Sequence, residues 1–423
     1  MNMKSPNMVK SPGAALPRIN RPGKISLSED SAGFHWWPLP IALTMVFAIF
    51  YMGNVLYDSG WLDQLTGGLV STQFNEENIL TGGCAAINHA ITWRELSRKA
   101  RRCARGSYYD PLHNTCAGCI PFIADDKFMA VSWDTKTNCS KLVEEAETRF
   151  VSHVYWSFAT VNAATGAVVA PVDEQDNTPL AKCMLQLRTR CIRQIGVIGD
   201  ISAQDSTFAA LDDANLPTFV STATDWVKTL KLDGLNIADP TGNTAAGVWT
   251  RGPFMLKAMK ALREGLDDAA LPEEPRLTLS WDEYAAAFDT GKNNTTGGCG
   301  AKNPTVRCFP TGLDTIVDTI QLQMHRRPET LPVANITATN WTAIIPRLNE
   351  KIMYTFRNNV GLTPKDLTAI AFDGTFKAKG AALYSATEDV ATNKAATLRD
   401  MGAKGAYGVL MPTQLVDMPI LPY

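Results

Sequence analysis

The chain has 423 residues, and at roughly 100 to 200 residues per domain this length predicts two or three folded units. Hydrophobic residues make up 45% and charged residues 19% of the chain, which excludes a disordered, collagen-like or coiled-coil protein. The 40 Lys and Arg residues against 42 Asp and Glu give a net charge of -2, so global electrostatics indicate no nucleic-acid partner.

The N-terminal part of the chain predicts a membrane anchor. Residues 1–35 form a basic tail with recurring prolines, which favours an extended segment. Residues 36–57 (WWPLPIALTMVFAIFYMGNVLY) carry no charge over 22 residues, enough for one membrane-spanning helix. Because basic residues precede this run and acidic residues follow it, we expect a single-pass protein with a cytosolic N-terminus. The rest is then lumenal, extracellular or on the equivalent side of a virion membrane.

Residues 58–145 are rich in turn residues and cysteines and predict a small disulfide-bonded connector. Its five cysteines are Cys84, Cys103, Cys116, Cys119 and Cys139. Five is an odd number, so one of them pairs with the distal domain, pairs with another chain or stays free. The pair Cys116 and Cys119 lacks a second pair or a His-x-x-x-His at zinc-site spacing, so disulfides are favoured and no metal or cofactor is expected.

The distal domain has four more cysteines. Cys299 and Cys308 bracket a Gly-rich loop that they would staple, and Cys183 and Cys191 are close enough in sequence to pair. Glycosylation sequons, which agree with an oxidising compartment, begin at Asn138, Asn293, Asn294, Asn335 and Asn340.

Residues 93–105 (WRELSRKARRCAR) carry six basic residues and one acidic residue. Two interpretations are open. The run either binds an anionic surface or is a solvated helix face, and the second is the more common role of such a run.

From residue 146 to residue 423 short apolar runs alternate with helical patterns, as in βα units around a parallel sheet. Strands are predicted at 149–161, 191–199, 232–238, 276–281, 315–325, 367–372 and 406–411, and helices at 254–269 and 340–359. This segment has 278 residues, close to the ~250 of an α/β protein with a (β/α)8 TIM barrel.

Five motifs in order carry a family resemblance. SHVYWSFATVNAATGAV from Ser152 resembles the first barrel strand of glycoside hydrolase family 18, the chitinase family. IGVIGD from Ile195 is similar to its third-strand Ser-x-Gly-Gly, and LKLDGLNIADP from Leu230 to its fourth-strand Asp-Gly-x-Asp-x-Asp-x-Glu. VDTIQLQMH from Val317 resembles the sixth strand and GAYGVLMP from Gly405 the last.

The resemblance also implies where catalysis would occur. In such a retaining enzyme a Glu protonates the glycosidic oxygen, and an Asp two residues earlier positions the substrate acetamide. Aligned from Asp233 and Gly234, the first motif Asp falls on Asn236, the orienting Asp on Ala238 and the catalytic Glu on Pro240. Neither alanine nor proline can do this chemistry, so the resemblance implies a degenerate, inactive site.

Other positions at the predicted site differ as well. Asp239 is a carboxylate one position early, and in a strand one residue of register turns a side chain to the opposite face. The candidates for ligand contact are Trp156, Trp281, Gln323 and His325. For Trp156, core packing and sugar stacking are both open. Pro412 stands in place of the eighth-strand Trp of the family.

These observations predict a membrane-anchored, catalytically inactive chitinase-like protein that binds a chitin-like or other glycan or serves as a structural surface component. One alternative is an active hydrolase that uses Asp239 or Glu283 with shifted geometry. Another is a purely structural subunit with protein partners in a surface or virion assembly.

Overall fold

The computed structural model describes residues 98–110, 113–121, 127–171, 179–199, 207–241, 251–288, 308–326, 347–357 and 378–408. All of these lie in the compact unit Phe74–Tyr423. The predicted tail 1–35 and the predicted membrane segment 36–57 lie outside the described residues. Within the described part, no helix combines the length and the apolar character needed to cross a bilayer.

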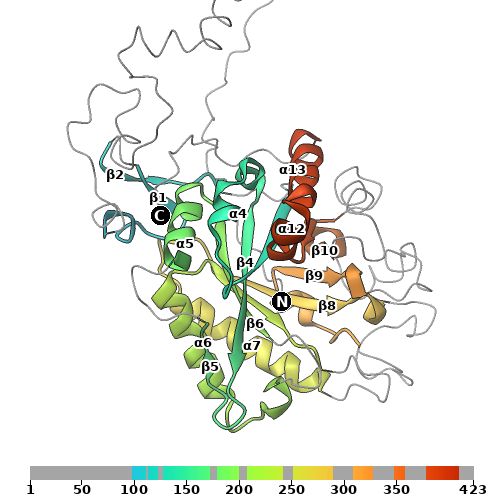
Figure 1. Cartoon of the computed structure of the whole chain (residues 1–423). Helices are drawn as coiled ribbons and strands as arrows, with labels where there is room; N and C mark the ends of the chain where they lie inside the picture. Colours follow the sequence, from blue (N-terminus) through green and yellow to red (C-terminus); the bar gives the residue numbers. More distant parts are fainter. Residues whose placement is uncertain are drawn as a thin grey trace, which may run out of the picture. The chain divides into compact units, whose positions relative to one another are not determined.

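Eight parallel strands close into a barrel with helices packed around it (Figure 1). The strands are β3 (Phe128–Asp134), β4 (His153–Val161), β6 (Arg193–Gly199), β7 (Gly234–Ala238), β8 (Thr278–Tyr284), β9 (Thr319–Gln323), β10 (Ile352–Phe356) and β11 (Gly380–Leu383). Each strand pairs with the next along the chain, and β3 pairs with both β4 and β11, which closes the sheet. The predicted TIM barrel is therefore confirmed.

The barrel begins earlier in the chain than predicted. Its first strand, β3, lies inside the segment 58–145 that the sequence assigns to a connector. The strand predicted to be first is the second, β4, and it starts at His153 because residues Ala146–Phe150 form the 3-10 turn η1. The run FMAVSWD lies next to the cysteine-rich segment, and that composition hides the strand. The connector therefore ends before Phe128.

The last two barrel strands also differ from the prediction. The helix predicted over 340–359 is confirmed at the short helix α10 (Leu348–Lys351) and is wrong over the next five residues, which form β10. The predicted last strand over 406–411 is wrong at residues 406–408, which belong to helix α13 (Ala396–Gly408). The eighth strand is β11. Short apolar runs that are buried on both faces show no period that separates strand from helix. The predicted strand 367–372 lies outside the described residues.

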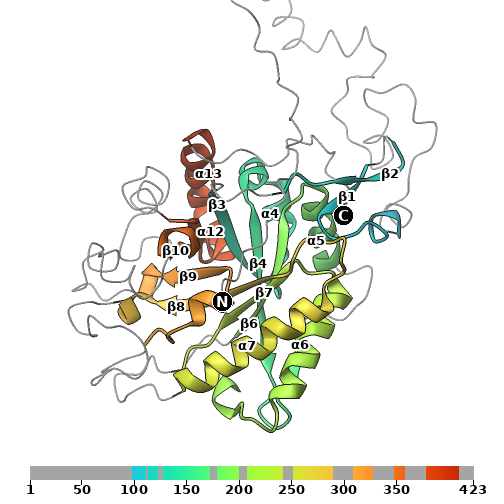
Figure 2. The ribbon, with the colours of Figure 1, turned by 180° about the vertical axis from the view of Figure 1, so that it is seen from behind.

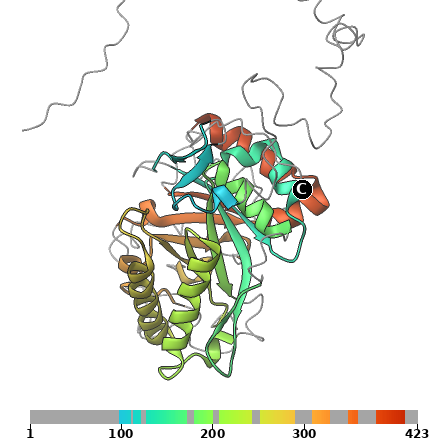
Figure 3. The same ribbon diagram turned by 90° about the vertical axis from the view of Figure 1, so that its left-hand side faces the viewer.

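Helices cover the outside of the barrel. The longer ones are α5 (Pro179–Thr189), α6 (Leu216–Leu230), α7 (Gly252–Ala269), α12 (Ala386–Asn393) and α13. The shorter elements are α4 (Ser140–Glu144), α8 (Leu313–Ile316), η2 (Thr207–Ala210), η3 (Ala285–Phe288) and η4 (Met324–Arg326). Figures 2 and 3 show α6 and α7 side by side against the sheet. Helix α7 confirms the prediction over 254–269, and its apolar stripe at three- and four-residue spacing is buried.

Side chains alternate between the two faces of each barrel strand, and the apolar ones form two separate clusters. The inner cluster fills the barrel and contains Phe128, Ala130, Tyr155, Ile195, Val197, Ala238, Met353 and Ala382. The outer cluster lies between sheet and helices and includes Trp133, Trp156 and Trp281. Gly196 allows α6 to approach the sheet closely, because a Cβ there would lie 2.6 Å from the ring of Trp226.

An antiparallel hairpin, β1 (Ser107–Asp110) with β2 (Thr115–Gly118), precedes the barrel. The disulfide Cys103–Cys116 closes this hairpin, and Cys119–Cys191 joins it to the barrel. A second short strand, β5 (Val168–Val169), pairs antiparallel with the end of β4. The cysteine-rich segment is thus disulfide-bonded, as predicted.

The cysteine pairing differs from the prediction in one respect. Cys183 bonds Cys139, 44 residues away, and it does not pair with Cys191. Cys183 lies within α5 and Cys191 follows its end, and at about 1.5 Å per helical residue they are too far apart for one bond. Two cysteines of the segment 58–145, not one, therefore pair with cysteines of the predicted distal domain. Cys308 is also disulfide-bonded, and Cys84 and Cys299 lie outside the described residues.

Candidate functional site

The carboxyl ends of the barrel strands surround a small pocket, which we call the barrel mouth. Its walls are Ser132, Tyr155, Ser157, Phe158, Val197, Asn236, Asp282, Gln321, Gln323, His325, Thr355 and Tyr384. Each of these residues belongs to a barrel strand or follows one closely. Active sites of TIM barrels lie at this end, so the barrel mouth is the candidate site.

A hydrogen-bonded group of polar side chains forms one wall of the barrel mouth. Asn236 Nδ2 donates to Asp282 Oδ1 at 2.9 Å, and Gln323 Nε2 donates to Asp282 Oδ2 at 3.2 Å. Ser280 Oγ donates to Asn236 Oδ1 at 2.7 Å, which orients the amide toward the carboxylate. Both oxygens of Asp282 therefore accept hydrogen bonds from amide groups on the neighbouring strands β7 and β9.

Tyr155 lies on the inward face of β4 with 2% of its surface exposed. Burial raises the pKa of its phenol to about 12, and the charge of Asp282 acts in the same direction. The nearby polar side chains of Thr319, Ser280 and Gln321 act in the opposite direction and lower this pKa. The phenol is consequently a neutral donor and acceptor at any physiological pH.

Two amide atoms at the barrel mouth have no hydrogen-bond partner among the residues that the structure describes. They are Gln321 Nε2, a donor, and Gln323 Oε1, an acceptor, and both are buried. Gln321 is 5% exposed, and its Oε1 already accepts from Thr355 Oγ1 at 3.3 Å. Leaving a buried polar atom unpaired costs about 1–3 kcal/mol, which a ligand with hydroxyl or amide groups can recover.

Aromatic rings line another part of the barrel mouth. His325 and Tyr384 stack with ring centroids 5.0 Å apart and an interplanar angle of 8°. Phe158 adds a third ring. Rings beside hydrogen-bonding groups suit a ligand that has both apolar faces and hydroxyl groups.

A larger groove continues from the barrel mouth. It shares Ser132, Ser157, Phe158 and Tyr384 with the barrel mouth and extends between the ends of β3 and β4 and helix α12. Its far side carries the ion pair Arg357–Glu388, with Nε and Oε2 2.7 Å apart. The two spaces together have the size of a site for a ligand longer than one small ring.

The end of β7 presents no carboxylate to the barrel mouth. Ala238 faces inward and belongs to the inner apolar cluster, and the next two residues are Asp239 and Pro240. The carboxylate of Asp239 is 1% exposed and accepts from the backbone N–H and the hydroxyl of Thr241, both at 2.8 Å. Asp233, at the start of the same motif, lies before β7 and thus at the opposite end of the barrel.

The predicted ligand contacts divide into two groups. Gln323 and His325 line the barrel mouth. Trp156 and Trp281 do not, because they alternate with the inward residues of their strands and pack in the outer cluster. Trp156 Nε1 donates to Gln194 Oε1 at 2.7 Å, so core packing is its role in this fold.

Glu283 lies beside Trp281 on the outward face of β8. It is fully buried, and its carboxylate accepts from Trp281 Nε1 and from the backbone N–H of Tyr284, both at 2.9 Å. The alternation that turns Glu283 outward turns Asp282 inward. Asp282 is the acidic residue of this strand that lines the barrel mouth.

Several residues of the barrel mouth were not predicted as site residues from the sequence, among them Tyr155, Gln321 and Tyr384. Tyr155 and Gln321 lie one and two positions before the predicted Trp156 and Gln323, so strand alternation is the signal that identifies them. Tyr384 follows β11, a strand that the sequence did not reveal. It occupies the end of the eighth strand, where Pro412 was predicted.

One of the predicted glycosylation sites, Asn138, lies in the described part of the chain. Asn138 is exposed, its side-chain oxygen accepts from the backbone N–H of Ser140, and Cys139 between them is in a disulfide. The remaining sequons, Asn293, Asn294, Asn335 and Asn340, lie outside the described residues. In the described part of the chain no three His, Cys, Asp or Glu side chains come together as a metal site.

Comparisons with known proteins identify the barrel by its shape. No family model matches the sequence, and no curated protein matches it either. Among solved structures, the GH18 chitinase from Cycas revoluta superposes with a TM-score of 0.52 at 13% identity, over 66% of this chain and 99% of that one. That chitinase is in complex with allosamidin in one structure and with (GlcNAc)3 in another, with the same values.

A chitinase from Rhizomucor miehei gives a TM-score of 0.49 at 14% identity, over 66% of this chain and 99% of that one. The superposition with the Cycas revoluta chitinase shows that the chain has a GH18 chitinase-like fold, and it covers 99% of that chitinase. Identities of this size show the fold alone.

Proposed function

We propose that the protein binds a glycan at the barrel mouth and does not hydrolyse it. The observation that carries the proposal is β7, where Asn236 lines the polar, ring-lined pocket and the end of the strand has Ala238 and Pro240 in place of the two carboxylates. A retaining chitinase-like mechanism needs an acid that protonates the glycosidic oxygen and a carboxylate that orients the acetamide. Alanine and proline supply neither group.

The carboxylates near the barrel mouth support the absence of hydrolysis. Asp239 accepts from Thr241 and Glu283 accepts from Trp281, and neither lines the cavity. Asp282 does line it, but its two oxygens accept from two different amide groups. A general acid must instead present an O–H to the leaving oxygen.

The remaining features support binding. Gln321 and Gln323 each have a buried amide atom that a sugar hydroxyl or acetamido group can pair with. Tyr384 and Phe158 supply ring faces, and the adjoining groove extends the space available. A chito-oligosaccharide is the ligand to test first, because the solved structures with this fold include complexes with (GlcNAc)3.

Calorimetric titration of the full-length protein with (GlcNAc)4 tests this proposal, together with chromatography of the sugar after prolonged incubation. We expect saturable binding and intact tetramer. Gln323→Ala should weaken binding about tenfold, since one hydrogen bond and its partner are lost. Gln186→Ala is the matched control, because it removes the same buried side chain from α5, near the N-terminal end of the barrel.

Two outcomes would contradict the proposal. Cleavage of the tetramer that disappears in Asp282→Asn would show a hydrolase with a displaced carboxylate. Absence of binding across a glycan array, with a folded protein by circular dichroism, would favour the structural role in an assembly. This structural role is the second candidate function. The stacked rings of His325 and Tyr384 support it, because they occupy part of the barrel mouth.

We propose further that residues 36–57 anchor the barrel on the non-cytosolic side of a membrane. The support is the uncharged run itself and the three disulfides of the described chain, since disulfides persist in oxidising compartments. Alkaline extraction of membranes should leave the full-length protein in the pellet. A protein released by this treatment, or a barrel digested by protease from the cytosolic side, would contradict the proposed topology.

A further inference from the structure

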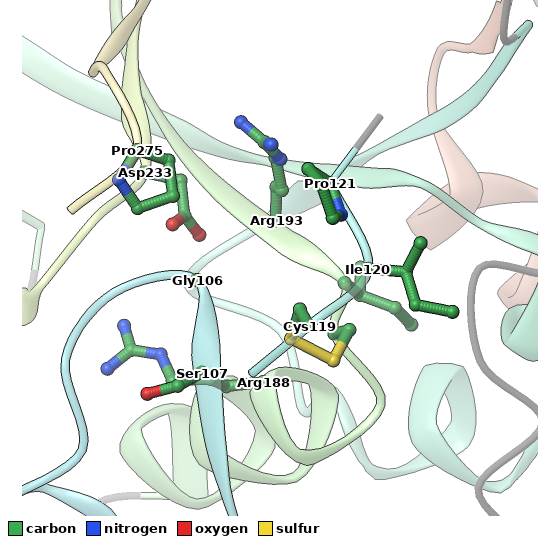
Figure 4. Close-up of a pocket in the computed structure, with 11 residues that line it drawn as sticks. Gly106, Ser107, Cys119, Ile120, Pro121, Arg188, Arg193, Asp233 and Pro275 are labelled. Atoms are coloured by element: carbon green, nitrogen blue, oxygen red, sulfur yellow. A yellow bond between two sulfur atoms is a disulfide. The ribbon is translucent and has the colours of Figure 1, made fainter. Parts of the chain in front are cut away.

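A second pocket lies at the N-terminal end of the barrel, opposite the barrel mouth (Figure 4). One of its walls belongs to the barrel, where Asp233 immediately precedes β7. Gly106 and Ser107, at the start of the hairpin, form another wall. The disulfide Cys119–Cys191 joins these walls and itself lines the space, which we call the basal pocket. Figure 4 shows the disulfide on one side of the pocket and Asp233 on another.

The disulfides of the described chain differ in their exposure to solvent. Cys139 and Cys183 are 1% and 0% exposed, so their bond lies in the core. Cys191 is 9% exposed, and Cys119 is part-exposed beside Ile120, which is 61% exposed. Thiol–disulfide exchange requires that a thiolate reach one sulfur atom of the bond. Cys119 therefore offers a point of attack that the Cys139–Cys183 bond lacks.

The backbone of Cys191 adopts a conformation that cysteine disfavours. Its φ is +59°, in the left-handed region. Its N–H donates to the carbonyl of Arg188 at 2.9 Å, and the N–H of Ile192 donates to that of Leu187 at 3.1 Å. Cys191 thus occupies the position after α5 where a Schellman motif usually has glycine, because a Cβ is unfavourable there. Reduction removes the covalent constraint on this turn, so the strain favours the dithiol form.

Noncovalent contacts also attach the hairpin to the barrel. Arg105, two residues before β1, donates to Glu274 from its backbone N–H at 2.9 Å and from its Nε at 2.8 Å. A small apolar cluster packs the same segment against α5, and its members are Ala100, Cys103, Tyr109 and Leu185. The chain itself runs on from the hairpin into β3. A hairpin whose disulfide is reduced therefore stays close to the barrel, and Cys119 can return to Cys191.

We propose that Cys119–Cys191 is a reversible redox switch, which a protein dithiol opens to free the hairpin from the start of β6. One thiolate of the dithiol attacks Cys119 Sγ and forms a mixed disulfide, and Cys191 leaves as a thiolate. The second thiol of the reductant then attacks its own sulfur in the mixed disulfide, which releases Cys119 and leaves the reductant oxidised. The reductant's two thiols supply two electrons and two protons to the cysteines. This switch does not depend on the proposed glycan site.

The position of the bond determines what its reduction changes. Gly106 packs so closely on Pro275 that a Cβ at Gly106 would lie 2.5 Å from the proline Cγ. Opening of the switch loosens this contact and widens the basal pocket. The bond Cys103–Cys116 lies within the hairpin segment, so its reduction leaves the attachment to the barrel in place.

Equilibration of the full-length protein with mixtures of reduced and oxidised dithiothreitol tests the proposal, with alkylation and mass spectrometry of the cysteine peptides. Cys119 and Cys191 should open together at reductant ratios about tenfold or more below those that open Cys139–Cys183. Tryptophan fluorescence should still report a folded barrel, and the same pair should re-form after the reductant is removed. Simultaneous reduction of both bonds, or re-formation with another partner, would overturn the proposal.

Hydrogen exchange measures whether the hairpin opens. The backbone N–H of Arg105 reports the attachment, because it donates to Glu274 across the interface. Its exchange rate relative to the amides of β6 should rise when Cys119 and Cys191 are both replaced by alanine.

The matched control replaces Cys139 and Cys183 by alanine. It also removes one disulfide, and the relative exchange rate of Arg105 should not rise. An unchanged rate in the first variant, or an equal rise in both variants, would refute the switch.

Discussion

Acidification should destabilise the barrel through His153, the first residue of β4. Its side chain is 2% exposed and lies against Phe128, with ring centroids 4.5 Å apart. Burial lowers the pKa of His153 well below 6.5, and the positive charges of Arg193 and Lys379 add to the effect. The native state therefore resists protonation of this imidazole while the unfolded chain accepts it.

The sign and the size follow from proton linkage. Below pH 6.5 the unfolded state binds one proton more than the native state, so the free energy of unfolding falls as the pH falls. At most this amounts to ~1.4 kcal/mol per pH unit, and to ~1.2 kcal/mol between about pH 6 and pH 5. Such a loss is a substantial part of the 5–15 kcal/mol typical of a folded domain.

Urea unfolding of the full-length protein at about pH 7, 6 and 5, followed by tryptophan fluorescence, measures this contribution. His153→Gln should be less stable near pH 7, because packing against Phe128 is lost, and its pH dependence should be shallower by the amount given above. His113→Gln is the control, since it removes an imidazole whose side chain is 75% exposed. Equal slopes in His153→Gln and the unchanged protein would refute the reasoning. So would an imidazole resonance of His153 that titrates at or above pH 6.5.

Three further substitutions test the fold. Replacing Cys139 and Cys183 by serine should lower the free energy of unfolding by ~4 kcal/mol, because their bond closes a loop of 44 residues. The midpoint of urea unfolding should fall accordingly, and an unchanged midpoint would contradict the prediction. Gly196→Ala should cost about 1–3 kcal/mol, since the new Cβ would meet Trp226 at 2.6 Å, and a neutral result would show that α6 shifts freely. Trp156→Phe should lower Tm through the lost indole hydrogen bond and leave the glycan Kd unchanged; a weakened Kd would return Trp156 to the ligand site.

Strand alternation explains much of what the sequence predicted correctly at the site. Gln323 and His325 were predicted from the position of one strand, and both line the barrel mouth. Trp156 was assigned to the right strand but to a role that its register does not allow. The residue before it, Tyr155, faces the barrel interior instead. A motif indicates which strand approaches a site, and the register of that strand decides which side chain enters it.

The strands that the sequence missed show a different limit. β3, β10 and β11 are short and almost continuously buried, so each lacks the polar and apolar alternation that marks a half-exposed strand. Their pairing with β4, β9 and one another makes them strands, and this pairing joins residues far apart in the chain. Tyr384 enters the barrel mouth only because β11 precedes it. Local sequence carries no record of such a long-range partner.

The sequence by itself determined the barrel architecture, the absence of an acid at Pro240 and the existence of a disulfide-bonded segment before the barrel. These three features follow from the types of residue and their order in the chain, which are read from propensity and from motif spacing. Tertiary structure alone decided that Cys119 and Cys139 reach Cys191 and Cys183, and that Asp282 rather than Glu283 faces the barrel mouth. It also placed the basic run beside Arg188 and Arg193. Closure of the barrel sets these neighbours, because it fixes the distances and directions between strands that the linear chain leaves free.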